Sequence, residues 1–346
     1  MNMNYLIAID GGGSKTESVL FTGTGEVLQR DLAQGVNALD VGIENAKQRV
    51  AGAIKRLSAQ LPEGGSLDSV YGGLAACVDY YPGVMYAFLR PQIKNAALRL
   101  EGDGGSLIAA MQGHSDGASL IAGTGSSLYI RSNDVLQRYG GWGPTIDTEG
   151  SGYKLGLHAF YAAFRSLDGR GPKTLLYDLI AEQMGAKPEN RLPEIYEKGR
   201  PYISMFAQCV FTARKLGDEV AYEIFDHGVK CLAELVEIGD RILQKDFFVY
   251  TGGGLFTFFP EYREALQAAI PPRATLVSID TEPIYGAAVE ALWSLGIDAD
   301  GAFKERFMKS YRALVASQSP GYENSTLDCG MLCRKPPADW SSPFTG

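Results

Sequence analysis

Apolar residues in the first 115 positions alternate between short continuous runs and runs with helical spacing. Continuous apolar runs bounded by glycine and polar residues predict buried strands. We expect five strands in this part of the chain, at 5–9, 17–21, 27–31, 70–75 and 98–100. Apolar residues at intervals of three and four predict a helix over 43–57, and shorter helices are expected at 84–89 and 106–111. This alternation favours an α/β fold.

The same order of parts begins again near residue 119. Leu6-Ile7-Ala8 and Leu120-Ile121-Ala122 each lead into a glycine-rich turn, a strand, a polar turn and a further strand. In the second copy the middle strand is expected at 128–131. The last strands begin with the same four residues, Val-Leu-Gln-Arg, at 27–30 and 135–138. The shared order predicts an internal duplication.

The rest of the chain is mostly helical up to residue 245. Strands are then expected at 247–251 and 275–279, and helices after residue 254, at 284–295, where Pro283 suits the first helical turn, and at 302–317. Residues beyond 318 are rich in Ser, Pro and Gly, which predicts an irregular tail. We expect four units: an N-terminal domain at 1–115, a C-terminal domain with a helical insert at 116–295, a helix at 296–318 placed to pack back on the first domain, and a tail at 319–346.

Composition narrows the classes of function. The chain has 346 residues and a net charge of −8, which argues against nucleic acid as the main partner. No signal peptide and no apolar run of membrane-spanning length is visible, so we expect a cytoplasmic protein without membrane contact. Five scattered cysteines argue against a disulfide framework, and Cys329 and Cys333 match neither a redox pair nor the common zinc spacings. Three histidines show no ligand spacing and are expected to be structural or exposed: His114, His158 and His227.

The segment Asp10-Gly-Gly-Gly-Ser-Lys-Thr16 lies between two apolar strands. Three glycines allow backbone N–H groups to approach a phosphate, and an aspartate at the end of a strand can hold a metal ion beside it. The helix that follows a P-loop is missing, and the Gly-Lys-Ser/Thr order is not met. The pattern predicts a phosphate loop in a β-hairpin, outside the P-loop and Rossmann folds.

Further glycine-rich turns follow other predicted strands, at 123–125, 140–143 and 252–254. One such turn is commonly just a tight turn. Two turns at equivalent places in a duplicated hairpin predict two loops that hold phosphates from opposite sides. Hydroxyl donors accompany both loops, at Ser14, Thr16, Thr124 and Ser126, and Lys15 adds a positive charge.

Six motifs, in order, resemble the N-acetylglucosamine kinase family, which is grouped with the BadF/BadG/BcrA/BcrD ATPases in the actin/hexokinase/heat-shock-ATPase superfold. They are Asp10-Gly-Gly-Gly-Ser-Lys-Thr16, Glu101-Gly-Asp103, Ala122-Gly-Thr-Gly-Ser126, Gly140-Gly-Trp-Gly143, Glu149-Gly-Ser-Gly-Tyr153 and Thr251-Gly-Gly-Gly254. The resemblance implies a two-domain actin-like ATPase (ribonuclease H-like) fold, with duplicated βββαβα cores and an interdomain cleft.

The same resemblance implies ATP and Mg²⁺ as cofactors. It implies that Asp10 helps place Mg²⁺ and that the two hairpin loops contact the phosphates. The third loop would flank the adenosine, near the helix start at 283–288. The implied nucleotide contacts are Gly11, Gly12, Gly13, Ser14, Lys15, Thr16, Thr124, Gly125, Ser126, Gly252, Gly253 and Gly254.

Asp103 matches the catalytic aspartate of the family. Phosphoryl transfer to a sugar hydroxyl needs a carboxylate that orients the hydroxyl and accepts its proton. The alternative is a plain turn aspartate before a helix. The resemblance implies further sugar contacts at Asn37, Asp103, Thr124, Gly141, Trp142, Gly143, Asp147 and Thr148, although locally Asn37 could be only a turn former and Trp142 a core residue.

Two departures from the family concern the sugar. The family usually reads Gly-Asp-Glu-Gly-Ser where this chain reads Asp147-Thr148-Glu149-Gly150-Ser151, so Thr148 stands at the position of the sugar-binding aspartate. The segment Glu101-Gly-Asp-Gly also replaces the common Asn-Asp-Ala. Asp147 would compensate only if the loop shifts.

Three functions remain open at this point. The leading hypothesis is an ATP-dependent kinase acting on N-acetylglucosamine or a related amino sugar, and dimers are usual in the resembling family, so we expect a homodimer. The first alternative is an ATPase that activates a dehydratase or reductase, but such proteins hold an iron–sulfur cluster between subunits, and no suitable cysteine follows the second phosphate loop. The second alternative is a sugar sensor without turnover, suggested by Thr148.

Overall fold

The computed structural model describes residues 3–13, 15–81 and 83–318. The expected tail at 319–346, with Cys329 and Cys333, lies outside the described residues, and so does Ser14. Within the described part, no helix is both long enough and apolar enough to cross a membrane.

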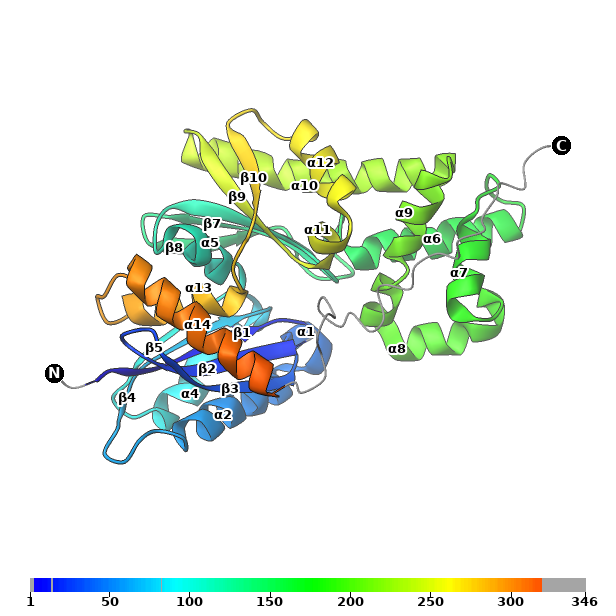
Figure 1. Cartoon of the computed structure of the whole chain (residues 1–346). Helices are drawn as coiled ribbons and strands as arrows, with labels where there is room; N and C mark the ends of the chain where they lie inside the picture. The colour runs from blue at the N-terminus through cyan, green and yellow to red at the C-terminus, as the bar shows by residue number, and fades with distance from the viewer. Residues whose placement is uncertain (1–2, 14, 82, 319–346) are drawn as a thin grey trace.

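Two five-stranded sheets with the same topology form the fold (Figure 1). The first contains β1 (Tyr5–Gly11), β2 (Lys15–Thr22), β3 (Val27–Gln34), β4 (Leu67–Leu74) and β5 (Ala97–Glu101), in the order β3-β2-β1-β4-β5. The second contains β6 (Gly117–Ala122), β7 (Ser126–Ser132), β8 (Val135–Tyr139), β9 (Phe247–Gly252) and β10 (Ala274–Ser278), in the order β10-β9-β6-β7-β8. In each sheet the first three strands are antiparallel and the later two run parallel to the first. The predicted duplication is confirmed.

Strand β1 is apolar throughout because both faces of the first sheet are covered. Side chains alternate between faces, so Ile7 and Ile9 enter one hydrophobic cluster while Leu6 and Ala8 enter another. The first cluster contains α2 (Ile43–Ser58) and α4 (Val84–Leu89). The second contains α13 (Pro283–Trp293) and α14 (Gly301–Gln318), which come from the far end of the chain.

Two helices cross between the sheets. Helix α5 (Gly104–Gln112) follows the last strand of the first sheet, yet Leu107 and Ile108 pack with Tyr250 of the second. Helix α13 follows the last strand of the second sheet, yet it packs against β1 and β4 of the first as well as against α5. The two halves of the chain therefore exchange a helix, and the expected domain boundary near residue 115 stays a prediction.

The middle of the chain is helical, as predicted. It contains α6 (Gly152–Leu167), α7 (Leu176–Met184), α8 (Leu192–Ser204), α9 (Ala207–Lys215) and α10 (Glu219–Leu243). In Figure 1, α6 to α9 extend to the right of the second sheet, and α10 runs along its upper side. Shorter helices complete the description: α1 (Ala38–Val41), α3 (Cys77–Tyr80), α11 (Gly254–Phe258) and α12 (Pro260–Ala269), with 3-10 turns at Arg90–Gln92 and Pro188–Arg191.

Candidate active site

The first and second glycine loops occupy equivalent hairpins, between β1 and β2 and between β6 and β7. Backbone bonds hold the first loop, because Ala75 N–H donates to Gly11 O at 2.8 Å and Val36 N–H donates to Gly12 O at 3.0 Å. The second loop is held from α6, whose Gly152 N–H donates to Gly123 O at 2.7 Å. Both loops are therefore fixed by the chain segments that follow in each half.

The third loop lies beside the second. A Cβ at Gly123 would stand 3.8 Å from Gly253 Cα, since β6 and β9 are neighbouring parallel strands whose ends meet at one edge. A nucleotide held at the second loop would thus reach the third loop and the start of α11.

An ion pair bridges the first and second loops. Arg200, at the kink inside α8, donates from Nε and Nη2 to the carboxylate of Asp40 in α1, at 3.0 and 2.5 Å. Asp40 Oδ2 would lie 3.8 Å from a Cβ at Gly13, and Arg200 Nη1 would lie 3.7 Å from one at Gly125. The two loops predicted to face each other are therefore brought together by residues that the sequence did not single out.

Several predicted phosphate ligands use their side chains to hold the protein. Thr16 is buried and donates to Gln34 O at 3.0 Å, and the hydroxyl of Ser126 donates to Glu149 O at 2.7 Å. Lys15 pairs with Glu17 at 3.2 Å, and Glu17 also accepts from Arg30 and Tyr311. These side chains therefore take part in holding the two loops.

Asp103 stands at the N-cap position of α5, and among the described residues its carboxylate makes no capping hydrogen bond to the helix. Instead Oδ1 lies 3.1 Å from the hydroxyl of Tyr129, which also lies 2.9 Å from Asp79 Oδ2. One hydroxyl proton serves two carboxylates. Burial, followed by the charge of Asp79, raises the pKa of Asp103 to about 6. This is the environment of a proton acceptor and differs from that of a turn former.

The glycines beside Asp103 make room for Tyr129. A Cβ on Gly102 would lie 2.3 Å from the Tyr129 ring, and one on Gly104 would lie 2.1 Å from it. The departure from the family's Asn-Asp-Ala thus has a steric cause, because the tyrosine that contacts Asp103 needs glycine on both sides. Glu101, the other unusual residue, accepts from Arg131 at 2.8 Å.

Asp10, at the end of β1, is a second carboxylate of raised pKa. Burial, with the charges of Asp103, Glu17 and Glu282, raises its pKa to about 7, while Lys15 acts in the opposite direction. Carboxylates that crowd in this way favour a cation among them. Because the charge of Asp103 contributes to the raised pKa of Asp10, the two carboxylates lie within electrostatic range of each other.

The predicted sugar contacts come from both halves of the chain. Asn37 caps α1 by accepting from Leu39 N–H at 3.0 Å, and its Cβ lies close to Gly13. Gly143 lies next to Leu39 of α1, since a Cβ placed on Gly143 would be 3.6 Å from Leu39 Cδ1. Trp142 is 56% exposed, so it is not a core residue.

Arg138 holds the 140–143 loop in place. Its guanidinium lies 4.3 Å from the ring centre of Tyr80 and 4.7 Å from that of Trp142, and it donates to Gly141 O at 3.0 Å. The Tyr80 hydroxyl also donates to Gly141 O. Burial raises the pKa of Asp79 and the charge of Arg138 opposes that rise, so this stack is connected to the carboxylates around Tyr129.

Thr148 is buried, and its hydroxyl oxygen accepts from Ser126 N–H at 3.0 Å. It holds the second phosphate loop from behind. Asp147 N–H donates to Gly143 O at 2.9 Å, and Asp147 Oδ2 would lie 3.5 Å from a Cβ at Gly140, close to Leu235 of α10. The local backbone thus directs the Asp147 carboxylate toward α10.

The histidines fall into two groups. His114 is buried and stacks on Trp293 at 3.5 Å between ring centres, as expected of a structural residue. His158 and His227 lie together with Glu149, their ligand atoms all within 4.8 Å of one another. The sequence predicted no ligand spacing for the histidines, and residue spacing carries no signature of this cluster, because a loop and two helices meet to form it.

Five residues of the site escaped the sequence analysis. Two form the bridge between the loops and three surround Asp103 and Trp142: Asp40, Arg200, Asp79, Tyr129 and Arg138. Each acts on a partner from another element, and local pattern carries no signal of such a contact.

Solved structures share this fold. A protein from Chromobacterium violaceum named as an N-acetylglucosamine kinase superposes with a TM-score of 0.65 at 23% identity, over 84% of this chain and 99% of that one. A glucokinase of the ROK family from Streptomyces griseus, solved with glucose and AMPPNP, has a TM-score of 0.51 at 16% identity, over 85% of this chain and all of the other. The predicted two-domain α/β actin-like fold is confirmed.

The chain belongs to the BadF/BadG/BcrA/BcrD ATPase family, whose model matches residues 7–291. It is 27% identical to the N-acetyl-D-glucosamine kinase of Dictyostelium discoideum, over 84% of this chain and 99% of that protein. It is also 27% identical to the N-acetylmuramic acid/N-acetylglucosamine kinase of Clostridium acetobutylicum, over 84% of this chain and 98% of that protein. The suspected family is confirmed, and the relatives named here are sugar kinases.

Proposed function

We propose that this chain is an ATP-dependent kinase that transfers the γ-phosphoryl group to a hydroxyl of N-acetylglucosamine or a related amino sugar. The observation that carries the proposal is Asp103, a carboxylate of raised pKa at the start of α5 that shares the hydroxyl of Tyr129 with Asp79 and raises the pKa of Asp10. Membership of an ATPase family and the sugar kinases among the relatives support the same reaction class.

Asp103 is the general base of the proposal. It would orient the acceptor hydroxyl and take its proton as the oxygen attacks the γ-phosphorus, which contributes about 10²–10⁴-fold to the rate. A pKa of about 6 keeps the carboxylate ionised at neutral pH while leaving it basic enough to accept a proton.

The residues present fit Mg²⁺. Burial and then the charge of Asp103 raise the pKa of Asp10, and its carboxylate supplies oxygen, the ligand atom that Mg²⁺ prefers. We assign Asp10 to the ion; bound there, Mg²⁺ would neutralise charge on the β- and γ-phosphates. Backbone N–H groups of Gly11 to Gly13 and of Thr124 to Ser126 would hold the phosphates, and Gly252 to Gly254 would flank the adenosine.

The acceptor would lie between Asn37, Asp103 and the 140–143 loop. Exposed Trp142 offers an apolar wall to a sugar ring, and its stacking on Arg138 keeps the ring in place. Thr148 would act through the second loop rather than on the sugar, because its hydroxyl oxygen already accepts from Ser126 N–H. The relatives are kinases of N-acetylglucosamine, N-acetylmuramic acid and, at 28% identity in Vibrio cholerae, glucosamine. These three sugars define the first panel of acceptors.

The test is coupled ADP release with ATP, Mg²⁺ and that panel, comparing the wild type with Asp103→Asn. We expect sugar-dependent ADP release from the wild type and a loss of about 10²–10⁴-fold in kcat in the variant, with ATP affinity retained. The variant should be at least as stable as the wild type at pH 8. An ionised carboxylate of raised pKa opposes folding above its pKa, and asparagine removes that charge.

Other results would select other functions. Sugar binding without ADP release in the wild type would favour the sensor. ADP release that ignores every sugar would favour an ATPase activator. Equal turnover in Asp103→Asn would refute the role of Asp103 whatever the substrate.

The homodimer and the cytoplasmic location stay predictions. The first rests on the resembling family and the second on composition. Light scattering after size exclusion would measure the mass of the particle against the 37.3 kDa of one chain.

A further inference from the structure

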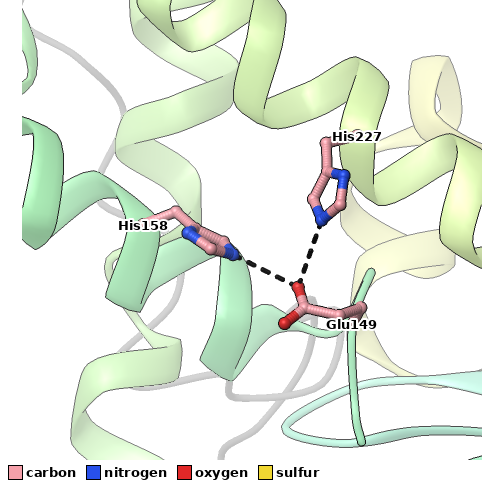
Figure 2. Close-up of side chains that lie close together, drawn as sticks. All are labelled: Glu149, His158 and His227. Carbon is pink, nitrogen blue, oxygen red and sulfur yellow. Dashed lines mark hydrogen bonds and ion pairs between the residues drawn. The ribbon is translucent and has the colours of Figure 1, made fainter.

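Two histidines and a glutamate converge on one point outside the proposed catalytic site (Figure 2). Glu149 lies in the loop before α6, His158 lies in α6, and His227 lies in α10. Figure 2 shows the Nε2 atoms of both imidazoles directed at the same carboxylate oxygen. The distances from Glu149 Oε2 are 3.2 Å to His158 and 3.6 Å to His227.

The His158 contact is a long hydrogen bond and the His227 contact is longer than one, and both separations also suit ligand atoms around one ion. A charge-assisted N–H···O bond is usually about 2.7–2.9 Å long. Nitrogen and oxygen ligands of tetrahedral Zn²⁺ lie about 2.0–2.1 Å from the metal, which places neighbouring ligand atoms about 3.3 Å apart. Both distances from Oε2 are close to that value.

The other oxygen of Glu149 has its own partner. Lys154 Nζ lies 2.8 Å from Oε1, so the ammonium fixes the carboxylate while Oε2 faces the imidazoles. A carboxylate held in this way by a neighbouring group is a common device for orienting a metal ligand. The side chains are also accessible, with His158 36% and His227 54% exposed, so an ion can enter from solvent.

We propose that Glu149, His158 and His227 form a binding site for a divalent transition-metal ion, with Zn²⁺ as the favoured ion. Imidazole suits Zn²⁺ and its neighbours in the first transition row, whereas Mg²⁺ takes oxygen ligands, so this site is chemically distinct from the one assigned to Asp10. Two histidines and one glutamate form a recognised zinc ligand set. A further potential donor is Cys231, whose Sγ lies 3.6 Å from His227 Nε2.

The site would tie α10 to the catalytic loops. The carbonyl of Glu149 accepts from Ser126 Oγ of the second phosphate loop at 2.7 Å, and Thr148 holds Ser126 N–H. An ion that joins Glu149 to His227 would therefore steady this loop from behind. The inference concerns metal binding alone and stands whether or not the proposed kinase reaction is correct.

The experiment measures zinc uptake by the full-length protein after chelation and dialysis. Histidine nitrogen NMR follows a Zn²⁺ titration, and the chain contains three histidines, of which buried His114 is an internal control. We expect saturable binding of one ion per chain, with shifts in the resonances of His158 and His227 and none in that of His114. His158→Ala and His227→Ala should each weaken binding at least tenfold, and the double variant should abolish it.

Glu223→Gln is the matched control, since Glu223 is an exposed carboxylate one turn before His227 on α10. It should bind zinc like the wild type. Circular dichroism and Tm without metal establish that each variant is folded, and the Tm of the wild type should rise with added Zn²⁺ while that of the double variant stays constant. Equal uptake by the double variant, or equal shifts at His114, would overturn the proposal and indicate adventitious zinc only.

Discussion

At the scale of single residues, the site depends on how one tyrosine hydroxyl is shared. The Tyr129 hydroxyl contacts both Asp103 and Asp79, so the two carboxylates compete for its one proton. The charge of Asp79 raises the pKa of Asp103, whereas the hydrogen bond from Tyr129 lowers it. Burial is the main cause of the raised pKa of Asp103, and two neighbours with opposing effects, which can be removed separately, adjust it further.

The pH dependence of kcat/KM tests this arrangement. We expect activity to fall on acidification through about pH 6, because protonated Asp103 cannot accept the proton of the acceptor hydroxyl. Asp79→Asn should move this limb to lower pH and Tyr129→Phe to higher pH. The control is Asp178→Asn, which removes an exposed carboxylate of α7 and should leave the acidic limb of the pH profile unchanged. Shifts of the two variants in the same direction would contradict the assignment.

At the scale of elements, the crossing of α5 and α13 joins the two sheets. Gly286 of α13 packs directly on the backbone of α5, where a Cβ would lie 1.8 Å from Ser106 O. Because α5 begins next to Asp103, this contact also positions the start of α5 and the proposed general base. The helices can approach so closely only because one of them has no side chain at the crossing point.

Gly286→Ala should therefore force the two helices apart. We expect a loss of about 1–3 kcal/mol in the free energy of unfolding, or more, since the clash is with backbone that cannot rotate away. Gly52→Ala is the control in the interior of α2, where a Cβ would meet the guanidinium of Arg56 at 3.1 Å, the end of a flexible side chain. That variant should be unchanged or stabilised by about 0.5–1 kcal/mol. Urea unfolding measures both, and equal stabilities would contradict the packing argument.

At the scale of the whole molecule, a buried ionic network connects the halves. Arg131 of β7 lies in the second sheet, and it binds Glu101 of β5 in the first sheet and Glu290 of α13. Arg131 and Glu290 are fully buried, and His114 lies 2.8 Å from Glu290. Charges removed from water are tolerated only when paired, so this network specifies how the two sheets fit together.

Arg131→Met should leave the buried carboxylate of Glu290 without its main partner and the partly buried carboxylate of Glu101 with Arg99 alone. We expect a loss of about 3–5 kcal/mol in the free energy of unfolding. Arg56→Met breaks an exposed pair with Asp31 and should cost less than about 1 kcal/mol. Chemical unfolding followed by circular dichroism compares the two variants with the wild type. Similar losses of unfolding free energy in the two variants would contradict the argument that burial makes the Arg131 network contribute more than the exposed pair.

The sequence by itself determined the elements, the duplication and the principal chemical groups. Apolar runs predicted the strands, and glycine turns after them predicted the loops, because strand pattern and turn chemistry are properties of neighbouring residues. Only the tertiary structure decided which side chains from distant parts of the chain come into contact. Three contacts join residues of different helices, strands and loops: the Arg200–Asp40 ion pair, the Tyr129–Asp103 contact, and the cluster of Glu149, His158 and His227. The packing of whole elements sets the distances in these contacts. Local sequence pattern does not encode that packing.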